Sequence, residues 1–94
     1  MSPEEELSRA VRAEQILGDD LFKEAVKEVE EALLNGIKLS PIKDAELREK
    51  LCQQLIQLHA VVGQIRGYME TGKLAEASIK QRTISERIKQ AVNW

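Results

Sequence analysis

Residues 44–71, DAELREKLCQQLIQLHAVVGQIRGYMET, decide the fold of this 94-residue chain because they predict one long amphipathic helix. Their large apolar residues recur mostly at alternating steps of four and three positions, close to the repeat of a coiled coil. Asp44 can cap the first turn, and Thr71-Gly72 is expected to end the helix after about 40 Å. The apolar stripe consists of Leu47, Leu51, Leu55, Leu58, Val62, Ile65 and Met69.

A second amphipathic helix is predicted over residues 21–35, capped by Asp19 or Asp20 and ended by Asn35-Gly36. Its apolar seam again follows steps of four, three and four positions. The two seams predict an all-α fold built on an antiparallel helical hairpin, about 21–35 with 44–71. The seam residues are Phe22, Val26, Val29 and Leu33, and Ile37, Leu39 and Ile42 are expected to fold back and close the open end of the pair.

The two ends of the chain are predicted to be accessory to this hairpin. Ser2 and Glu5 form an S-x-x-E capping box, so an N-terminal helix is expected to begin at once and to end near Gly18. The last part of the chain has only a thin apolar stripe and is expected to be a short helix or tail that a partner orders. We therefore divide the chain into a helical domain, 1–77, and a basic C-terminal segment, 78–94.

Composition limits the classes of protein to which the chain can belong. The net charge is only −2, but residues 1–39 hold ten acidic and five basic residues, whereas residues 73–94 hold two acidic and five basic ones. Aromatic residues make up 3% of the chain, so aliphatic side chains must supply almost the whole core. The single cysteine excludes an intramolecular disulfide. No apolar run is long enough to span a bilayer, so no membrane association is expected.

The chain offers no residues for a catalytic or metal site, so we expect a protein that is not an enzyme. Cys52 and His59 share a helix face but lie two turns apart, about 10.5 Å, which is beyond hydrogen-bond reach. A packed cysteine and a surface or interface histidine are the simpler interpretation. One histidine and one cysteine cannot build a tetrahedral zinc site, and no phosphate-binding or dinucleotide-binding motif occurs. Neither a cofactor nor a small-molecule substrate is expected.

The second half of the long helix is the candidate interaction surface. Gly63 and Gly67 lie one turn apart, and glycine inside a helix costs about 0.5–1 kcal/mol relative to alanine, so another helix is expected to approach closely there. The shorter partner helix covers only about half of the stripe. Either the first helix and the tail cover the rest, or another chain does. The candidate residues are Ala60, Val62, Gly63, Ile65, Gly67, Met69, Ile84, Ile88 and Trp94.

Three segments resemble a family of small helical proteins of tailed bacteriophages. They are Arg12–Val26 (RAEQILGDDLFKEAV), Asp44–Leu51 (DAELREKL) and Gly72–Ala75 (GKLA). The resemblance covers about residues 9–77, and its motifs are mostly helix caps and core positions. Two features depart from the family pattern: one residue fewer precedes Arg48, and an aliphatic stretch near Ile37 replaces a common aromatic residue. The resemblance implies a gene near those for virion structure and carries over no catalytic residue.

These observations predict a non-enzymatic phage protein that acts by protein–protein contact, in virion assembly or as a minor virion component. Its expected partners are copies of itself or other phage structural proteins, in the host cytoplasm or the virion. The alternative is a small phage modulator that binds a host enzyme or nucleic acid. Nucleic acid is the weaker expectation, because a solvated helix face also explains the basic tail. The basic residues are Lys73, Lys80, Arg82, Arg87 and Lys89, and Trp94 could stack on a base.

Overall fold

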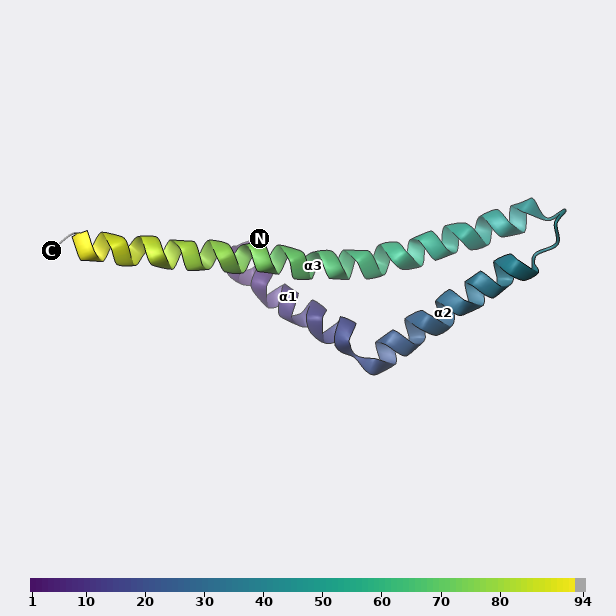
Figure 1. The fold of residues 1–94 in the computed structure, drawn as a ribbon, viewed down its shortest axis with the longest axis horizontal. Helices are drawn as coiled ribbons and strands as arrows, with labels where there is room; N and C mark the ends of the chain where they lie inside the picture. The colour runs from purple at the N-terminus through teal and green to yellow at the C-terminus, as the bar shows by residue number, and fades with distance from the viewer. Residues whose placement is uncertain (93–94) are drawn as a thin grey trace. The chain divides into compact units, whose positions relative to one another are not determined.

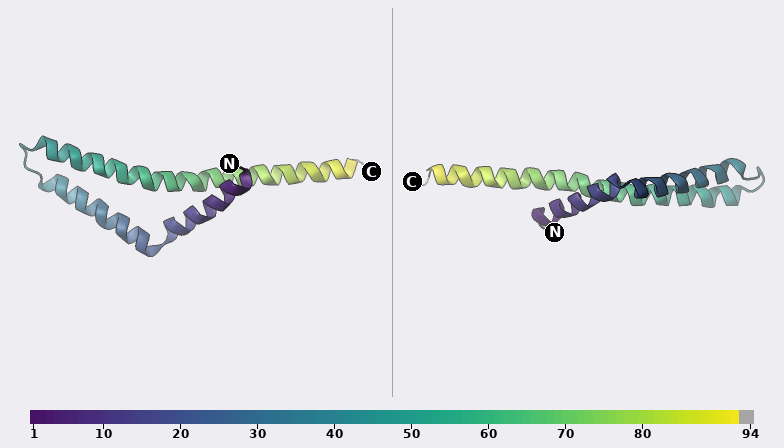
Figure 2. Two further views of the ribbon diagram at one scale, coloured as in Figure 1. Left: turned by 180° about the vertical axis from the view of Figure 1, so that it is seen from behind. Right: turned by 90° about the horizontal axis from the view of Figure 1, so that it is seen from below.

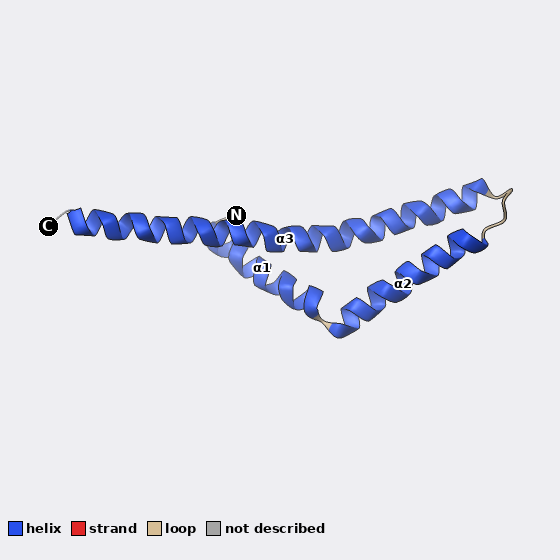
Figure 3. Ribbon diagram, viewed as in Figure 1, coloured by secondary structure: helices blue, strands red, loops and turns tan. Residues whose placement is uncertain are grey.

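A computed structural model describes residues 1–92, and within that range the chain is all-helical, as the sequence predicts. The three helices are α1 (Pro3–Gly18), α2 (Asp20–Leu39) and α3 (Ala45–Val92) (Figures 1 and 3). They hold 91% of the described residues, none of which lies in a strand. None of the described helices is both long enough and apolar enough to cross a membrane.

The starts of the first two helices agree with the predicted caps. Ser2 Oγ accepts a hydrogen bond from the Glu5 backbone N–H at 3.2 Å and donates to the Glu5 carboxylate at 3.1 Å. Asp19 has an extended backbone conformation, and its carboxylate accepts from the Phe22 N–H at 2.8 Å. Each cap satisfies a backbone donor that has no partner inside the helix. Asp19 therefore separates α1 from α2.

The predicted end of α2 at Asn35-Gly36 is wrong, because α2 continues to Leu39 and is capped by Ser40. The Ser40 hydroxyl donates to the Ile37 carbonyl at 2.6 Å, which satisfies one of the last free acceptors of the helix. Gly36 has a packing role instead. A Cβ atom built there would lie 3.1 Å from a terminal methyl carbon of Leu51, so the missing side chain makes room for α3.

The connection between α2 and α3 is fixed by polar contacts and not by the predicted apolar closure. Leu39 is 83% exposed and Ile42 is 93% exposed, so neither folds back onto the helices. The Arg48 guanidinium instead donates to the Pro41 carbonyl at 2.6 Å and to the Ile42 carbonyl at 3.1 Å. One arginine from the first turn of α3 thereby holds the connection in place. Two further views show the backbone of this connection from behind and from below (Figure 2).

The predicted end of the long helix at Thr71-Gly72 is also wrong, because α3 runs unbroken for 48 residues to Val92. The Thr71 hydroxyl donates to the Gly67 carbonyl one turn earlier, at 3.0 Å, and does not cap an end. The next five residues, KLAEA, are all good helix formers, so one glycine is too small a penalty to stop the helix. The segment expected to be a separate short helix or tail belongs to α3, whereas the domain division at residue 77 stays a prediction.

The described chain forms two units, each with its own contacts. The terminal unit joins residues 1–15 to the part of α3 from residue 66 onward, and the central unit comprises residues 16–65. The buried hydrophobic residues of the described chain are three alanines, Ala10, Ala13 and Ala75, and all of them belong to the terminal unit. Every residue of the central unit is at least partly exposed. The chain on its own therefore covers little of its large apolar surface.

Replacing the N-cap of α3 tests the described helix start. The Asp44 carboxylate accepts from the Leu47 N–H at 3.0 Å, so Asp44→Ala should lower the free energy of unfolding by about 1 kcal/mol. Chemical denaturation followed by circular dichroism measures this change. Lys43→Ala, at an exposed neighbour outside the cap, is the matched control and should leave stability nearly unchanged. Equal stability of the two variants would contradict the cap.

Candidate protein-interaction surface

The core of the terminal unit is a close contact between small residues of α1 and α3. Ala10 and Ala13 of α1 are buried, and so are Gly72 and Ala75 of α3. A Cβ atom built on Gly72 would collide with the Ala10 Cβ and would lie 3.6 Å from the Glu6 carbonyl oxygen. The two backbones can approach this closely only because position 72 has no side chain. Gly72 is therefore a packing residue inside α3.

Two charged contacts flank this small-residue contact. The Arg9 guanidinium lies over the Tyr68 ring, with its central carbon 4.1 Å from the ring centroid, in cation–π geometry. The Arg82 guanidinium forms an ion pair and hydrogen bond with the Glu4 carboxylate. This hydrogen bond lowers the pKa of Glu4 and raises the pKa of Arg82. Both pairs join residues far apart in the sequence, so they report directly on the pairing of α1 with α3.

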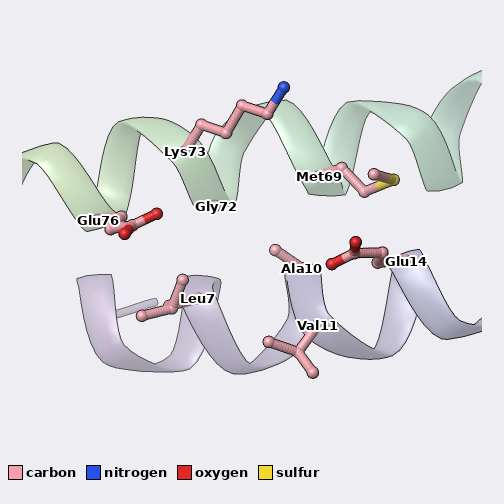
Figure 4. Close-up of a pocket in the computed structure, with 8 residues that line it drawn as sticks. All are labelled: Leu7, Ala10, Val11, Glu14, Met69, Gly72, Lys73 and Glu76. Atoms are coloured by element: carbon pink, nitrogen blue, oxygen red, sulfur yellow. The ribbon is translucent and has the colours of Figure 1, made fainter.

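A shallow groove of about 390 Å³ lies beside the contact (Figure 4). Leu7 and Val11 line it from α1, and Met69 lines it from α3. Lys73 is on the α3 side, with its ammonium group directed away from α1 (Figure 4). The apolar part of the groove lining includes Met69, one of the predicted surface residues. Met69 therefore lies in a partly covered position and not on an open face.

The predicted surface residues are divided between the two units. In the central unit, Ala60 and Gly63 are exposed, whereas Val62 and Ile65 are half-buried. In the terminal unit, Gly67 and Met69 are half-buried, and Ile84 and Ile88 are each more than half exposed. Trp94 lies outside the described residues. That these residues form an interaction surface stays a prediction.

Close helix approach occurs at Gly72 in the described chain and not at Gly63 or Gly67. A Cβ built at either Gly63 or Gly67 meets nothing within 4 Å. A second row of small and larger residues on α3 was not predicted, because Gly72 looks like a helix end in the sequence. A signal was present, since the row repeats at steps of four, three, four and three positions, as a helix seam does. This row consists of Tyr68, Gly72, Ala75, Ile79 and Arg82.

Cys52 and His59 occupy separate environments in the central unit. Cys52 is a free, exposed thiol, so the expectation of a packed cysteine is wrong. His59 Nε2 lies 3.2 Å from the Glu30 carboxylate of α2, as expected for a surface histidine. Among residues 1–92, no three histidine, cysteine or acidic side chains gather as a potential metal site. The contact between His59 and Glu30 joins α3 to α2 within the central unit.

A pair of glycine substitutions tests the close contact. Gly72→Ala should lower the free energy of unfolding by about 1–3 kcal/mol, because the new methyl group overlaps Ala10 and forces the helices apart. Gly63→Ala enters open space in the described chain and should raise that free energy by about 0.5–1 kcal/mol through better helix propensity. Urea unfolding of both variants makes the comparison. A stabilising Gly72→Ala would contradict the contact.

The Glu4–Arg82 pair predicts a defined pH dependence. Because the folded chain lowers the pKa of Glu4 below 4.5, the pair stabilises the fold above that pH and loses its effect as the pH falls through the lowered pKa. Arg82→Gln should return the pKa of Glu4 toward 4.5 in an NMR titration. Arg87→Gln, at an exposed position one and a half turns further along α3, should not. A Glu4 titration unaffected by Arg82→Gln would exclude the pair in solution.

Comparisons with protein families, characterised proteins and solved structures give no match to this chain.

Proposed function

We propose that this chain is a non-enzymatic, phage-encoded helical protein that acts by protein–protein contact, in virion assembly or as a minor virion component. The observation that carries the proposal is the imbalance between covered and exposed apolar surface. The buried hydrophobic residues of the described chain are alanines, whereas fourteen large hydrophobic residues are exposed. Where such residues form a contiguous patch, the patch marks a site at which another protein binds. Its place of action is the host cytoplasm, the virion or both.

The phage origin rests on the resemblance of three segments to a family of small phage proteins. Each of those segments contains residues that make structural contacts in the fold. The first, Arg12–Val26, contains the Asp19 cap between α1 and α2, and the second, Asp44–Leu51, contains the cap of α3 and the Arg48 contact with the connection. The third, Gly72–Ala75, contains the close contact with α1. The resemblance therefore concerns residues with structural roles, as expected for a protein that works as a scaffold.

We also propose the finer arrangement of the central unit, an antiparallel hairpin of α2 with residues 45–65 of α3. Two contacts support it. Gly36 near the end of α2 meets Leu51 near the start of α3, and Glu30 in the middle of α2 meets His59 further along α3. Lower positions in α2 thus pair with higher positions in α3, as antiparallel helices require. The hairpin provides two neighbouring helices on which a partner can lie.

Mass spectrometry of phage particles tests the proposed role. The source phage is grown, and both mature virions and purified assembly intermediates are digested and quantified against the major structural protein. The chain should be present at a fixed copy number in virions, in assembly intermediates or in both. Absence from both fractions, in cells where the chain is expressed, would overturn a role in assembly or in the particle.

The charge distribution supports a second candidate, a phage modulator that binds a host enzyme or nucleic acid. Arg87 and Lys89 are exposed near the end of α3. Two other basic residues there are paired within the chain, Lys80 with Glu76 at 3.2 Å and Arg82 with Glu4, which lowers the charge left for phosphates. Salt-dependent binding of DNA or RNA at micromolar concentration would favour this candidate. If neither DNA nor RNA binds, the chain is not a modulator that acts on nucleic acid.

A further inference from the structure

The last part of α3 carries an exposed apolar stripe. From Leu74 to Ala91, apolar residues and one glutamine recur at steps of three, four, three, four and three positions. This is the alternation of the two core positions in the heptad repeat of a coiled coil. We call these six residues the C-terminal seam, and all of them are exposed. They are Leu74, Ala77, Gln81, Ile84, Ile88 and Ala91.

The C-terminal seam lies on the side of α3 that faces away from α1. Within the terminal unit, α1 packs against the row that contains Gly72 and Ala75. At about 100° per residue, that row is roughly 150° round the helix from the seam. Leu74 is 74% exposed, and Ile84 and Ile88 are 57% and 58% exposed. The terminal unit therefore packs through one side of α3 and leaves the opposite side in water.

The two edges of the C-terminal seam differ in charge. Along one edge, which we call the basic edge, Lys73, Lys80 and Arg87 recur at intervals of seven positions. The other edge carries Ser78 and Ser85. All five residues are exposed, and the Lys73 ammonium group is directed away from α1 (Figure 4). In a coiled coil, residues at these flanking positions form ion pairs with the partner helix and decide which partner binds.

No acidic residue lies in the C-terminal seam or on its edges. Within residues 73–91, the acidic residues are Glu76 and Glu86, and both lie outside these positions. Glu76 pairs with the Lys80 ammonium group at 3.2 Å, but both side chains are exposed, so this pair is weak and is easily exchanged for another. Glu70 stands where the repeat would continue toward the N-terminus. The seam therefore spans 18 residues, about 27 Å of helix.

The shape of the C-terminal seam favours a single helix as its occupant. A stripe that follows the heptad repeat has the width of one partner helix. A helix that lies on a membrane surface needs a broad apolar face rich in tryptophan, phenylalanine or leucine. The seam has one leucine, two alanines and, in its middle, the polar Gln81. A nucleic acid would contact the basic edge and leave Ile84 and Ile88 in water.

The charges favour an acidic partner over the same seam of a second copy. If two such seams packed in antiparallel, basic edge would meet basic edge and the like charges would repel. If they packed in parallel, each basic edge would face serines and no ion pair would form. A helix with carboxylates at its flanking positions can form an ion pair with each residue of the basic edge. Charge complementarity of this kind determines specificity at protein interfaces.

We propose that the C-terminal seam binds an amphipathic helix of another protein, whose apolar stripe is flanked by acidic residues. This proposal rests on the proposed function and names the chemistry of the partner. Large apolar side chains of the partner fill the space beside Ala77 and Ala91. A polar side chain opposite Gln81 fixes the register of the two helices. The carboxylates of the partner lie along the basic edge.

Two synthetic helical peptides test the chemistry of this partner. Both consist of three heptads with leucine at the core positions, and they differ only at the flanking positions, which hold glutamate in one peptide and lysine in the other. Like charges on the flanks keep each peptide from pairing with itself. Fluorescence anisotropy with the full-length chain in about 0.1 M salt measures both affinities. The acidic peptide should bind at least about tenfold more tightly than the basic one.

Substitutions in the chain should change this preference in a defined way. Lys80→Glu combined with Arg87→Glu should make the basic peptide the tighter ligand, whereas Lys89→Glu, at an exposed position outside both edges, should not. Ile84→Gln should weaken binding of the acidic peptide at least about tenfold, because its side chain no longer fills the apolar interface. Ile56→Gln, at a similarly exposed isoleucine of α3, is the matched control and should change it less than about twofold.

Several results would overturn the proposal. They are the absence of binding to the acidic peptide, equal affinity for both peptides, and a preference that charge reversal does not change. Binding of DNA, RNA or phosphatidylglycerol vesicles without binding of the acidic peptide would assign the basic edge to phosphate groups instead. Self-association in light scattering that Ile84→Gln abolishes and Ile56→Gln preserves would assign the C-terminal seam to a second copy.

The outcomes also separate this proposal from the proposed function. A chain that is present in virions or assembly intermediates but does not prefer the acidic peptide overturns only the acidic partner. A chain that shows the preference and its reversal but is absent from both fractions overturns only the role in assembly or in the particle. The peptide measurement uses the purified full-length chain, so it does not depend on the result from phage particles.

Discussion

The constraint on which the rest of this structure depends is that, among residues 1–91, no large apolar side chain is buried. The close contact of Ala10 with Gly72 brings α1 onto α3, and it succeeds because both residues are small. Small residues, however, bury little apolar surface. The contact therefore fixes the positions of the helices in the terminal unit without supplying a large core, and the larger aliphatic residues remain available to a partner.

The helices and their starts could be predicted because they depend on neighbouring residues. Ser2, Asp19 and Asp44 each accept from a backbone N–H three positions later, and such local bonds can be inferred from the sequence. The ends of α2 and α3 could not be predicted in this way. Gly36 and Gly72 were both interpreted as ends, but each is inside a helix where the other helix of its unit needs the space of a side chain. A glycine at a helix end and one at a close contact look alike in a single sequence.

The contacts between helices were only partly predictable from the sequence for the same reason. The stripe from Leu47 to Met69 predicts an apolar side of α3, but it does not show which residues of α2 lie beside it. The contact between Glu30 and His59, residues 29 positions apart, joins the two helices in the structure. The Arg48 contact with the connection was equally hidden, because a guanidinium bound to backbone carbonyls leaves no pattern of residue types. Contacts of this kind can be recognised only in the three-dimensional structure.

The spacing of contacts along the chain has a consequence for the order in which the units fold. In the central unit, Gly36 meets Leu51, and only 15 positions separate them. In the terminal unit, Ala10 meets Gly72 across 62 positions, and Glu4 meets Arg82 across 78. Closing a loop of 62 residues costs about 1.3 kcal/mol more chain entropy than closing one of 15. We therefore expect the central unit to form first and the two ends of the chain to join last.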